Sequence, residues 1–249
     1  MKNWILVGCV VACLTSAAYA EQPTLGKKGL GLVESAGYGE PQLQAVQAAW
    51  YYNWGASSQV KTARQFVPMA FSLRFLKTPS QEPLLLGFNE PDNARQSDIS
   101  VQVALTQWPF MASKTKRIGS PAMAGNPVTG DWLPLFMKQQ PKVDFVTLHW
   151  YKGVSASKFI KDVQALCTAY QKPVWVTEFA PQTASQSQES PDKYSQAQVN
   201  QFIQETVHWM NASDCVERFA WHDAKVGTSA LFDAKGRLTL TGKAYAEAY

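Results

Sequence analysis

Short runs of apolar residues recur along the chain, and each is followed by a polar or a helical stretch. Several runs are continuous instead of alternating, as in LLLGF at 84–88 and VWVTEF at 174–179. Continuous apolar runs of this length are typical of strands buried on both faces of a parallel sheet. The pattern predicts eight strands: Leu30–Glu34, Trp50–Trp54, Phe66–Phe71, Leu84–Phe88, Arg117–Pro121, Asp144–Trp150, Val174–Glu178 and Arg218–His222.

Amphipathic helical patterns lie between the predicted strands. In residues 159–170 and again in residues 199–210, apolar side chains recur at the spacing that places them on one helix face. Ser157 occupies the expected N-cap position of the first of these helices, and Pro173 follows where that helix must already have ended. The apolar positions are Phe159, Ile160, Val163, Leu166, Cys167 and Tyr170, and then Val199, Phe202, Ile203, Val207 and Met210.

The alternation of strands with helices predicts the fold class. A strand, a crossover helix and a second strand form the βαβ unit, so repeated alternation favours an α/β fold with a parallel sheet. Eight strands in residues 21–249 is the count of a (β/α)8 barrel of TIM type. No internal repeat, low-complexity tract or linker divides this stretch. We therefore expect residues 21–249 to form a single barrel domain.

The first twenty residues have the pattern of a secretory signal peptide. A basic start, Met1-Lys2-Asn3, precedes an apolar run that is too short to span a bilayer, and Ala18-Tyr19-Ala20 fits the small-residue cleavage pattern. We expect cleavage after Ala20 and a secreted or periplasmic protein, with lipid anchoring at Cys13 as the alternative. No later segment is long and apolar enough to span a membrane.

Removal of the signal peptide leaves two cysteines, Cys167 and Cys215. An even pair in an oxidising compartment predicts a disulfide, and two buried free thiols are the alternative. Cys167 lies near the end of the helix after the sixth strand, and Cys215 lies just before the eighth strand. In a barrel both positions fall near the amino-terminal rim, so a bridge between them is geometrically reasonable.

Composition and charge exclude several classes of protein. Only 17% of the residues are charged and 46% are hydrophobic, which excludes a disordered chain. The net charge is +4, but Lys and Arg form no cluster, so we expect no nucleic acid partner. His222 and Asp223 lack the companion residues of metal motifs, and no G-x-S-x-G motif of serine hydrolases occurs. We expect a monomer that needs neither a metal nor another cofactor.

Two glutamates stand out at the carboxyl ends of predicted strands, where barrel enzymes place their active sites. Glu90 follows the fourth strand, and Glu178 ends the seventh. A carboxylate directly after a buried apolar run is costly to bury without a partner or a task. Two carboxylates that converge at a mouth rich in Trp, Tyr and His suggest cleavage of a glycosidic bond, which needs an acid on one side and a carboxylate on the other.

The residues around both glutamates resemble the signatures of the large retaining clan of barrel glycoside hydrolases. Within it, the set of motifs is most similar to glycoside hydrolase family 128, the endo-β-1,3-glucanases, and the likeness covers most of residues 21–249. The segments that carry the resemblance are WYYNW (50–54), LGFNEPD (86–92), DFVTLHWY (144–151), WVTEF (175–179) and GTSALFD (227–233).

The resemblance implies a role for each matched residue. Glu90 would be the acid/base and Glu178 the nucleophile of a retaining mechanism with a covalent glycosyl-enzyme. Asn89 would bind the 2-hydroxyl of the sugar, Tyr151 would donate a hydrogen bond to the nucleophile, and His149 would bind a sugar hydroxyl. His149 and Tyr151 are two residues apart on one strand, so both are expected to face the barrel interior.

Further substrate contacts are expected from the other strand ends and from loops. Asn53 and Trp54 end the second strand, and Trp54 and Trp221 carry flat apolar faces that suit a pyranose ring; packing in the core is the alternative for both tryptophans. The polar stretch Gln182–Asp192 after the seventh strand is a loop candidate.

The expected partner is therefore a β-1,3-glucan polysaccharide or oligosaccharide, cleaved internally. Two other interpretations remain open. The same mechanism would serve a β-1,4-glucan or a mannan, because the sequence does not show subsite geometry. A non-catalytic carbohydrate-binding protein built on a hydrolase barrel is the interpretation from a different class.

Overall fold

The computed structural model describes residues 1, 26–77, 83–181, 193–222 and 227–249. The predicted signal peptide, with Cys13 inside it, lies outside the described residues apart from Met1. The loop candidate Gln182–Asp192 lies outside them as well. Both therefore stay predictions.

Eight parallel strands, counted over the described residues, form the centre of the molecule. Six of them pair in the order β3-β2-β1-β8-β7-β6, and β4 pairs with β5. Isolated parallel bridges, Met69 with Leu86 and Gly119 with Phe145, join these two groups at β3–β4 and at β5–β6, so the ring of strands closes. The strands are β1 Lys28–Gly31, β2 Trp50–Tyr52, β3 Gln65–Phe66, β4 Leu84–Leu85, β5 Arg117–Ile118, β6 Val146–Trp150, β7 Val174–Phe179 and β8 Val216–Trp221.

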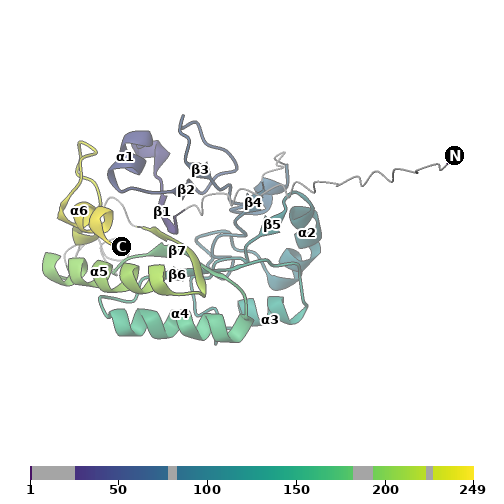
Figure 1. Cartoon of the computed structure of the whole chain (residues 1–249). Helices are drawn as coiled ribbons and strands as arrows, with labels where there is room; N and C mark the ends of the chain where they lie inside the picture. The colour runs from purple at the N-terminus through teal and green to yellow at the C-terminus, as the bar shows by residue number, and fades with distance from the viewer. Residues whose placement is uncertain (2–25, 78–82, 182–192, 223–226) are drawn as a thin grey trace.

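Helices cover the outside of the ring, and each longer one follows a strand. In Figure 1, α4 and α5 run side by side below β6 and β7, and α6 lies next to α5. Residues 53–64, between β2 and β3, are described and contain no helix. The helices are α1 Glu40–Ala45, α2 Val101–Ser113, α3 Trp132–Lys138, α4 Ala156–Tyr170, α5 Gln196–Ala212 and α6 Leu240–Glu247, with 3-10 turns η1 Glu34–Ala36, η2 Leu73–Lys77 and η3 Gly227–Ser229.

The predicted α/β barrel is thus confirmed, with local corrections. The first strand spans Lys28–Gly31 instead of residues 30–34, because the chain turns into η1 at Glu34. The N-cap of α4 is Ser155, not Ser157: the Ser155 hydroxyl accepts a hydrogen bond from the Lys158 backbone N–H at 3.2 Å. Both amphipathic helices are present, and their predicted apolar face is the one that they bury.

The buried side chains form two groups, one inside the barrel and one between the strands and the helices. Residues on a strand alternate between these groups because successive side chains point to opposite faces. On β8, for example, Ala220 lies inside while Phe219 and Trp221 face the helices. The interior group consists of Trp50, Tyr52, Val67, Met69, Leu84, Leu86, Phe145, Trp175 and Ala220.

A bulge in β7 interrupts this alternation. Leu148 of β6 pairs with Val176, but the next residue, His149, pairs with Glu178, so Thr177 is an extra residue in β7. Counting by twos from Trp175, which lies inside the barrel, would turn Glu178 toward the helices. The bulge instead turns Glu178 toward the mouth of the barrel.

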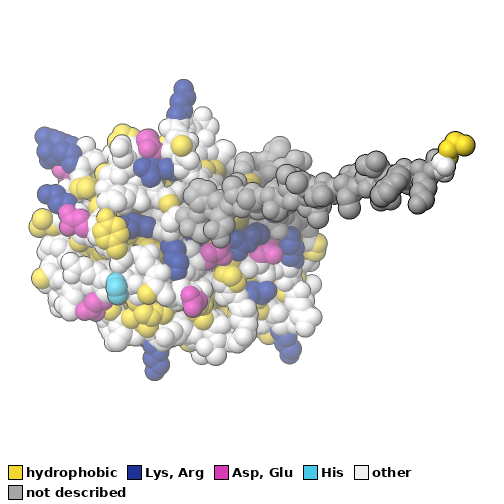
Figure 2. All heavy atoms as spheres, in the orientation of Figure 1, with side chains coloured by type: hydrophobic (Ala, Val, Ile, Leu, Met, Phe, Trp, Pro, Cys, Tyr) yellow, Lys and Arg dark blue, Asp and Glu magenta, His cyan; other side chains and the backbone are white. Residues whose placement is uncertain are grey.

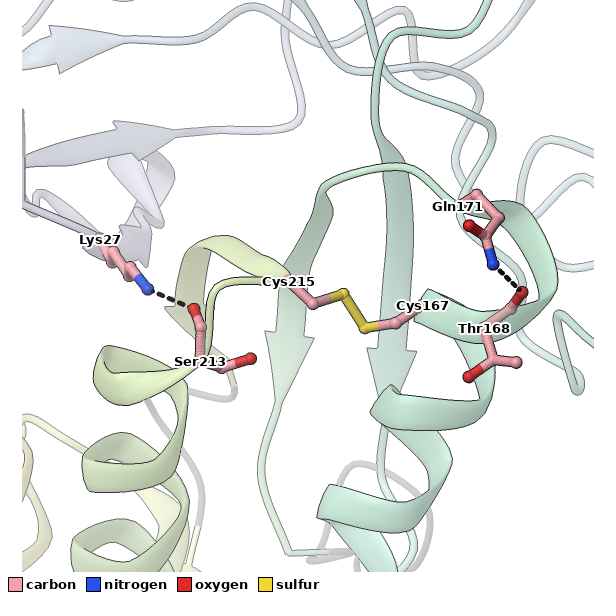
Figure 3. Close-up of a disulfide and its surroundings, with 6 residues drawn as sticks. All are labelled: Lys27, Cys167, Thr168, Gln171, Ser213 and Cys215. Carbon is pink, nitrogen blue, oxygen red and sulfur yellow. Dashed lines mark hydrogen bonds between the residues drawn. A yellow bond between two sulfur atoms is a disulfide. The ribbon is translucent and has the colours of Figure 1, made fainter.

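The predicted disulfide between Cys167 and Cys215 is present, with the two Cα atoms 6.2 Å apart. It joins the last turn of α4 to the segment that enters β8 (Figure 3). Beside it, the Lys27 ammonium donates a hydrogen bond to the Ser213 carbonyl at 2.7 Å and so satisfies a carbonyl just beyond α5. The two contacts tie α4, α5 and the start of β1 together at the amino-terminal rim.

The surface agrees with a modest net charge. On the face seen in Figure 2, Lys and Arg side chains are scattered among acidic, apolar and uncharged ones. Within the described part of the chain, no helix combines the length and the apolar character needed to cross a bilayer.

Candidate active site

Glu90 and Glu178 meet at the carboxyl ends of the strands. Glu90 lies just beyond β4, and Glu178 lies within β7. One oxygen of each carboxylate and a ring nitrogen of His149 all lie within 4.8 Å of one another. The two glutamates open into a cavity of about 540 Å³. Its lining consists of Glu90, Asn93, Arg95, Gln96, Tyr151, Glu178 and His222.

Two aromatic side chains donate hydrogen bonds to the Glu178 carboxylate, and a third, Tyr52, divides its single hydroxyl proton between Glu178 and the nearer Thr177 carbonyl at 2.9 Å. The Tyr151 hydroxyl donates to Oε2 at 2.5 Å. The Trp54 Nε1–H donates to Oε1 at 2.9 Å, and the Tyr52 hydroxyl lies 3.3 Å from the same oxygen. Burial, followed by the charge of Glu178, raises the pKa of Tyr52 and of Tyr151 well above its usual value, so both remain donors. The carboxylate is thus held by both of its oxygens.

These contacts keep Glu178 ionised although it is buried. Burial by itself would raise the pKa of Glu178. The positive charges of His149 and His222, together with the hydrogen bonds from Tyr151 and Trp54, outweigh burial and lower that pKa below its ordinary value. A buried carboxylate that stays charged is a candidate nucleophile or electrostatic partner.

Glu90 has different neighbours. The His149 Nδ1 atom lies 2.9 Å from its Oε1, and the Asn93 side-chain amide donates to its Oε2 at 3.1 Å. Its backbone has a φ of +43°, and its N–H donates to the Ala122 carbonyl at 2.8 Å. A left-handed conformation in a residue other than glycine persists only where surrounding contacts impose it, and such residues cluster at functional sites.

His149 stands between the two glutamates. Its Nδ1 atom bonds to Glu90 and lies 3.6 Å from Oε2 of Glu178. Burial would lower the pKa of His149, but the negative charges of Glu178 and Glu90 outweigh burial and raise that pKa above its ordinary value. Its Nε2 atom is buried and has no hydrogen-bond partner among the described residues.

Comparison with known proteins identifies the family. The family model named glycosyl hydrolase catalytic core matches residues 34–245. A solved structure of a glycoside hydrolase family 128 (subgroup I) endo-β-1,3-glucanase from Amycolatopsis mediterranei, in complex with laminarihexaose, is 30% identical with a TM-score of 0.77. The match covers 90% of this chain and 99% of that one. The chain belongs to glycoside hydrolase family 128.

Other structures of family 128 extend the comparison. A subgroup III curdlan-specific exo-β-1,3-glucanase from Blastomyces gilchristii is 28% identical with a TM-score of 0.70, and the match covers 91% of this chain and all of that one. A subgroup VII oligosaccharide-binding protein from Trichoderma gamsii is 25% identical with a TM-score of 0.71, over 92% and 97% of the two chains. No match was found among curated protein sequences.

In this family 128 chain, most of the residues proposed from sequence converge on one place. Asn89 lies buried beside Glu90, and its side-chain amide donates to Gln96 Oε1 at 3.2 Å while its Oδ1 atom has no partner among the described residues. His149 and Tyr151 both point inward, as expected from their spacing.

The structure gives two of the proposed substrate contacts, Trp221 and Asn53, other contacts, and it brings Trp54 to the site. Trp221 is buried between β8 and the helices, where it packs against Phe179 and donates from Nε1 to the Ser229 carbonyl, so it offers no face to a sugar. Asn53 shapes the loop after β2, because its side chain bonds to Glu34 and to the Gly55 backbone. Trp54 does reach the site, but its indole N–H is directed at Glu178.

His222 is the main cavity residue that sequence reasoning missed. Ala220 of β8 lies inside the barrel, and His222, two residues later, lies on the same face, so the register of β8 places it in the cavity. Asn93 and Gln96 lie in the loop after β4, and no periodic pattern identifies loop residues of this kind. Tyr52 was quoted in a motif but not singled out, although it touches Glu178.

Glu90, His149 and Glu178 also form a cluster that could hold a metal ion, since each offers one ligand atom. The donor atoms already bond within the protein: the His149 Nδ1 atom is engaged by Glu90, and both Glu178 oxygens accept hydrogen bonds. This donor set is therefore accounted for without a metal. The expectation of a metal-free enzyme stays a prediction.

Proposed function

We propose that the protein is a secreted, retaining glycoside hydrolase that cleaves internal β-1,3-glucosidic bonds, with Glu178 as nucleophile and Glu90 as acid/base. The observation that carries the proposal is the approach of the two carboxylates to within 4.8 Å in one cavity. Retaining enzymes place their carboxyl groups about 5–5.5 Å apart, whereas inverting enzymes leave about 6.5–9.5 Å for a water molecule. The short separation favours direct attack by a carboxylate.

The reaction has two steps. In the first, a Glu178 oxygen attacks C1 of the sugar while Glu90 transfers its proton to the departing glycosidic oxygen, which leaves a covalent glycosyl-enzyme. In the second, Glu90 takes a proton from water as the water oxygen attacks C1, and Glu178 is released as a carboxylate. The lowered pKa of Glu178 suits this role because the first step requires the ionised form.

The remaining groups of the cavity support the same chemistry. Asn89 has a buried Oδ1 atom without a partner, which suits acceptance of a hydrogen bond from the sugar 2-hydroxyl. Contacts to this hydroxyl strengthen in the transition state. His149 likewise keeps its Nε2 atom free for a second sugar hydroxyl, while its Nδ1 atom lies between the two carboxylates.

Support for a β-1,3-glucan comes from relatives, and support for internal cleavage comes from the shape of the site. A second cavity of about 520 Å³ lies next to the first and shares Gln96 with it. Trp54, Phe71 and Arg74 line this second cavity. A glycan bound at the glutamates therefore has room to extend past the reacting sugar, as an internal cut requires.

Incubation of the purified protein with laminarin, mannan and carboxymethyl-cellulose would test the substrate and the mode of cleavage together. Short β-1,3-linked oligosaccharides from laminarin alone are expected, and proton NMR of the first products should show the β-anomer. Cleavage of another glycan would contradict the proposed substrate, and initial release of the α-anomer would contradict the retaining mechanism.

Glu90→Gln separates an enzyme from a binding protein. The amide keeps the size of the side chain but has no proton to donate, so turnover on laminarin should fall by about 10²- to 10⁴-fold. Calorimetry should find the affinity for laminari-oligosaccharides nearly unchanged. Glu247→Gln, which alters an exposed glutamate at the end of α6, is the matched control and should leave both quantities unchanged.

A protein that binds oligosaccharides without cleaving them is the second candidate, because the family 128 oligosaccharide-binding protein from Trichoderma gamsii has a similar fold. That function would make the wild type bind laminari-oligosaccharides without releasing products, and Glu90→Gln would then change nothing in turnover. Burying the charged form of Glu178 costs free energy, and binding without cleavage includes no step that requires this carboxylate to be ionised.

A further inference from the structure

His222 contacts Trp54 and Tyr151, the two side chains that donate hydrogen bonds to different oxygens of Glu178. It follows β8, and its backbone N–H donates to the Phe179 carbonyl at 3.3 Å. Its ring meets the Trp54 ring edge-on, with centroids 4.9 Å apart, and the Tyr151 ring at 6.3 Å. Its Nδ1 atom is buried without a hydrogen-bond partner among the described residues, and the side chain lines the catalytic cavity.

Trp54 needs such support because its own backbone does not favour the observed conformation. Its φ is +61°, in the left-handed region that a bulky aromatic residue rarely adopts. A strained residue keeps its conformation only when surrounding contacts fix it. Gly31 leaves room beside the indole, where a Cβ atom would come within 3.1 Å, and the rings of Tyr52 and His222 both pack edge-on against it.

We propose that His222 is a positioning residue for Glu178: its ring holds Trp54 and Tyr151 in the orientations in which each donates a hydrogen bond to a different carboxylate oxygen. This inference rests on the proposed function, in which Glu178 is the nucleophile. An oxygen that must attack C1 needs a fixed direction, and small misplacements of a reacting group are costly in rate. His222 thus acts on the reaction through its neighbours.

The imidazole has a second effect, through charge. When protonated, His222 favours the ionised form of Glu178 and adds to the larger effect of His149. Loss of the His222 ring nitrogens should therefore raise the pKa of Glu178 as well as loosen its donors. Among the described residues, the titratable and charged groups that share the site with Glu178 are His149 from β6, Tyr151 just after it, Tyr52 from β2, Glu90 and Arg95 after β4, and His222 after β8.

Two substitutions separate the two effects. His222→Ala removes the ring and the charge, and we expect kcat on laminarin to fall by about 10- to 100-fold with little change in KM. His222→Phe keeps a ring against Trp54 and Tyr151, so it should recover most of the lost kcat. Both variants should move the acidic limb of the kcat/KM profile to higher pH. His208→Ala, at an exposed position on α5, is the control and should change neither quantity.

The outcomes that would overturn the inference are distinct. Wild-type kcat and an unmoved acidic limb in His222→Ala would exclude any action on Glu178. Equal loss of kcat in both variants with unmoved acidic limbs would indicate a merely structural role. If His222→Ala does not fold, the acidic limb of His222→Phe decides. Failure of the wild type to cleave any glycan would instead refute the proposed function, and this inference with it.

Discussion

Glu178 shows how a buried carboxylate is kept charged by its immediate contacts. Burial acts against the ionised form, and an isolated carboxylate in this place would take up a proton. Hydrogen bonds to both oxygens and the charges of His149 and His222 reverse that tendency. Glu90 shares the cavity but has other partners: it shares a hydrogen bond with His149 Nδ1 and accepts one from the Asn93 amide. Two chemically identical side chains are thus prepared for different tasks by their neighbours.

The pH profile should report this difference. The pKa of Glu178 is lowered below 4.5, so in more than half of the molecules the Glu178 carboxyl group is ionised at pH 4.5. The midpoint of the acidic limb of the kcat/KM profile should therefore lie below pH 4.5. His149→Gln removes the largest of the stabilising charges, so the pKa of Glu178 should rise and the acidic limb should move upward. Laminarin hydrolysis measured from about pH 3 to about pH 8 would check both statements. An acidic limb that stays in place in His149→Gln would contradict the assigned charge effect.

The sequence indicated both glutamates because each follows a buried apolar run at a strand end, which is a local feature. It also indicated His149 and Tyr151, since spacing by two fixes a common face. Of the two interpretations open for Trp221, the structure shows packing in the core, and His222, which the sequence analysis considered only as a metal ligand, lines the cavity instead. The choice between two adjacent residues depends on the register of β8 in the barrel, which single-chain periodicity does not fix.

At the level of elements, the decisive feature is the bulge in β7. One extra residue, Thr177, shifts the pairing so that Glu178 lies opposite His149 and faces the mouth of the barrel. Regular alternation from Trp175 would have buried the carboxylate under the helices. Because a bulge is set by the pairing of two strands, the apolar run VWVTEF contains no visible sign of it.

The close approach of β1 to β2 depends on glycine. A Cβ atom at Gly29 would lie 2.4 Å from the Trp50 indole, which the hydrogen bond from its Nε1–H to the Lys27 carbonyl holds in place. Gly29→Ala should therefore lower the free energy of unfolding by about 1–3 kcal/mol, as measured by urea denaturation. Gly26→Ala is the matched control, because its Cβ atom would meet only Ala49 at 3.5 Å. Equal stability of the two variants would contradict the expected overpacking.

At the scale of the whole molecule, the candidate catalytic glutamates and the disulfide lie at opposite ends of the barrel. The glutamates lie at the carboxyl ends of the strands, while Cys167, in the last turn of α4, and Cys215, just before β8, lie at the amino-terminal rim. The disulfide stabilises the fold globally, because it restricts the unfolded chain between residues separated by 48 positions.

Removal of the disulfide should weaken the fold without changing the catalytic site. The chain-entropy model gives about 4 kcal/mol for a loop of this size, and measured values for native disulfides are typically about 2–5 kcal/mol. The double variant Cys167→Ser with Cys215→Ser should lose free energy of unfolding in this range while its kcat on laminarin at low temperature stays at the wild-type value. Each single variant should lose a similar amount. A folded double variant with strongly reduced kcat would contradict the separation of the two ends.

The sequence by itself determined the features that depend on local periodicity: eight apolar runs, two amphipathic helices, a pair of cysteines and a glutamate at each of two strand ends. These follow from which side chains avoid water along one element. Tertiary structure alone decided which side of a strand faces the site, the bulge that turns Glu178, the strained Trp54 and the place of His222. Those features arise from pairing and packing between segments distant in sequence, and no local pattern encodes such contacts.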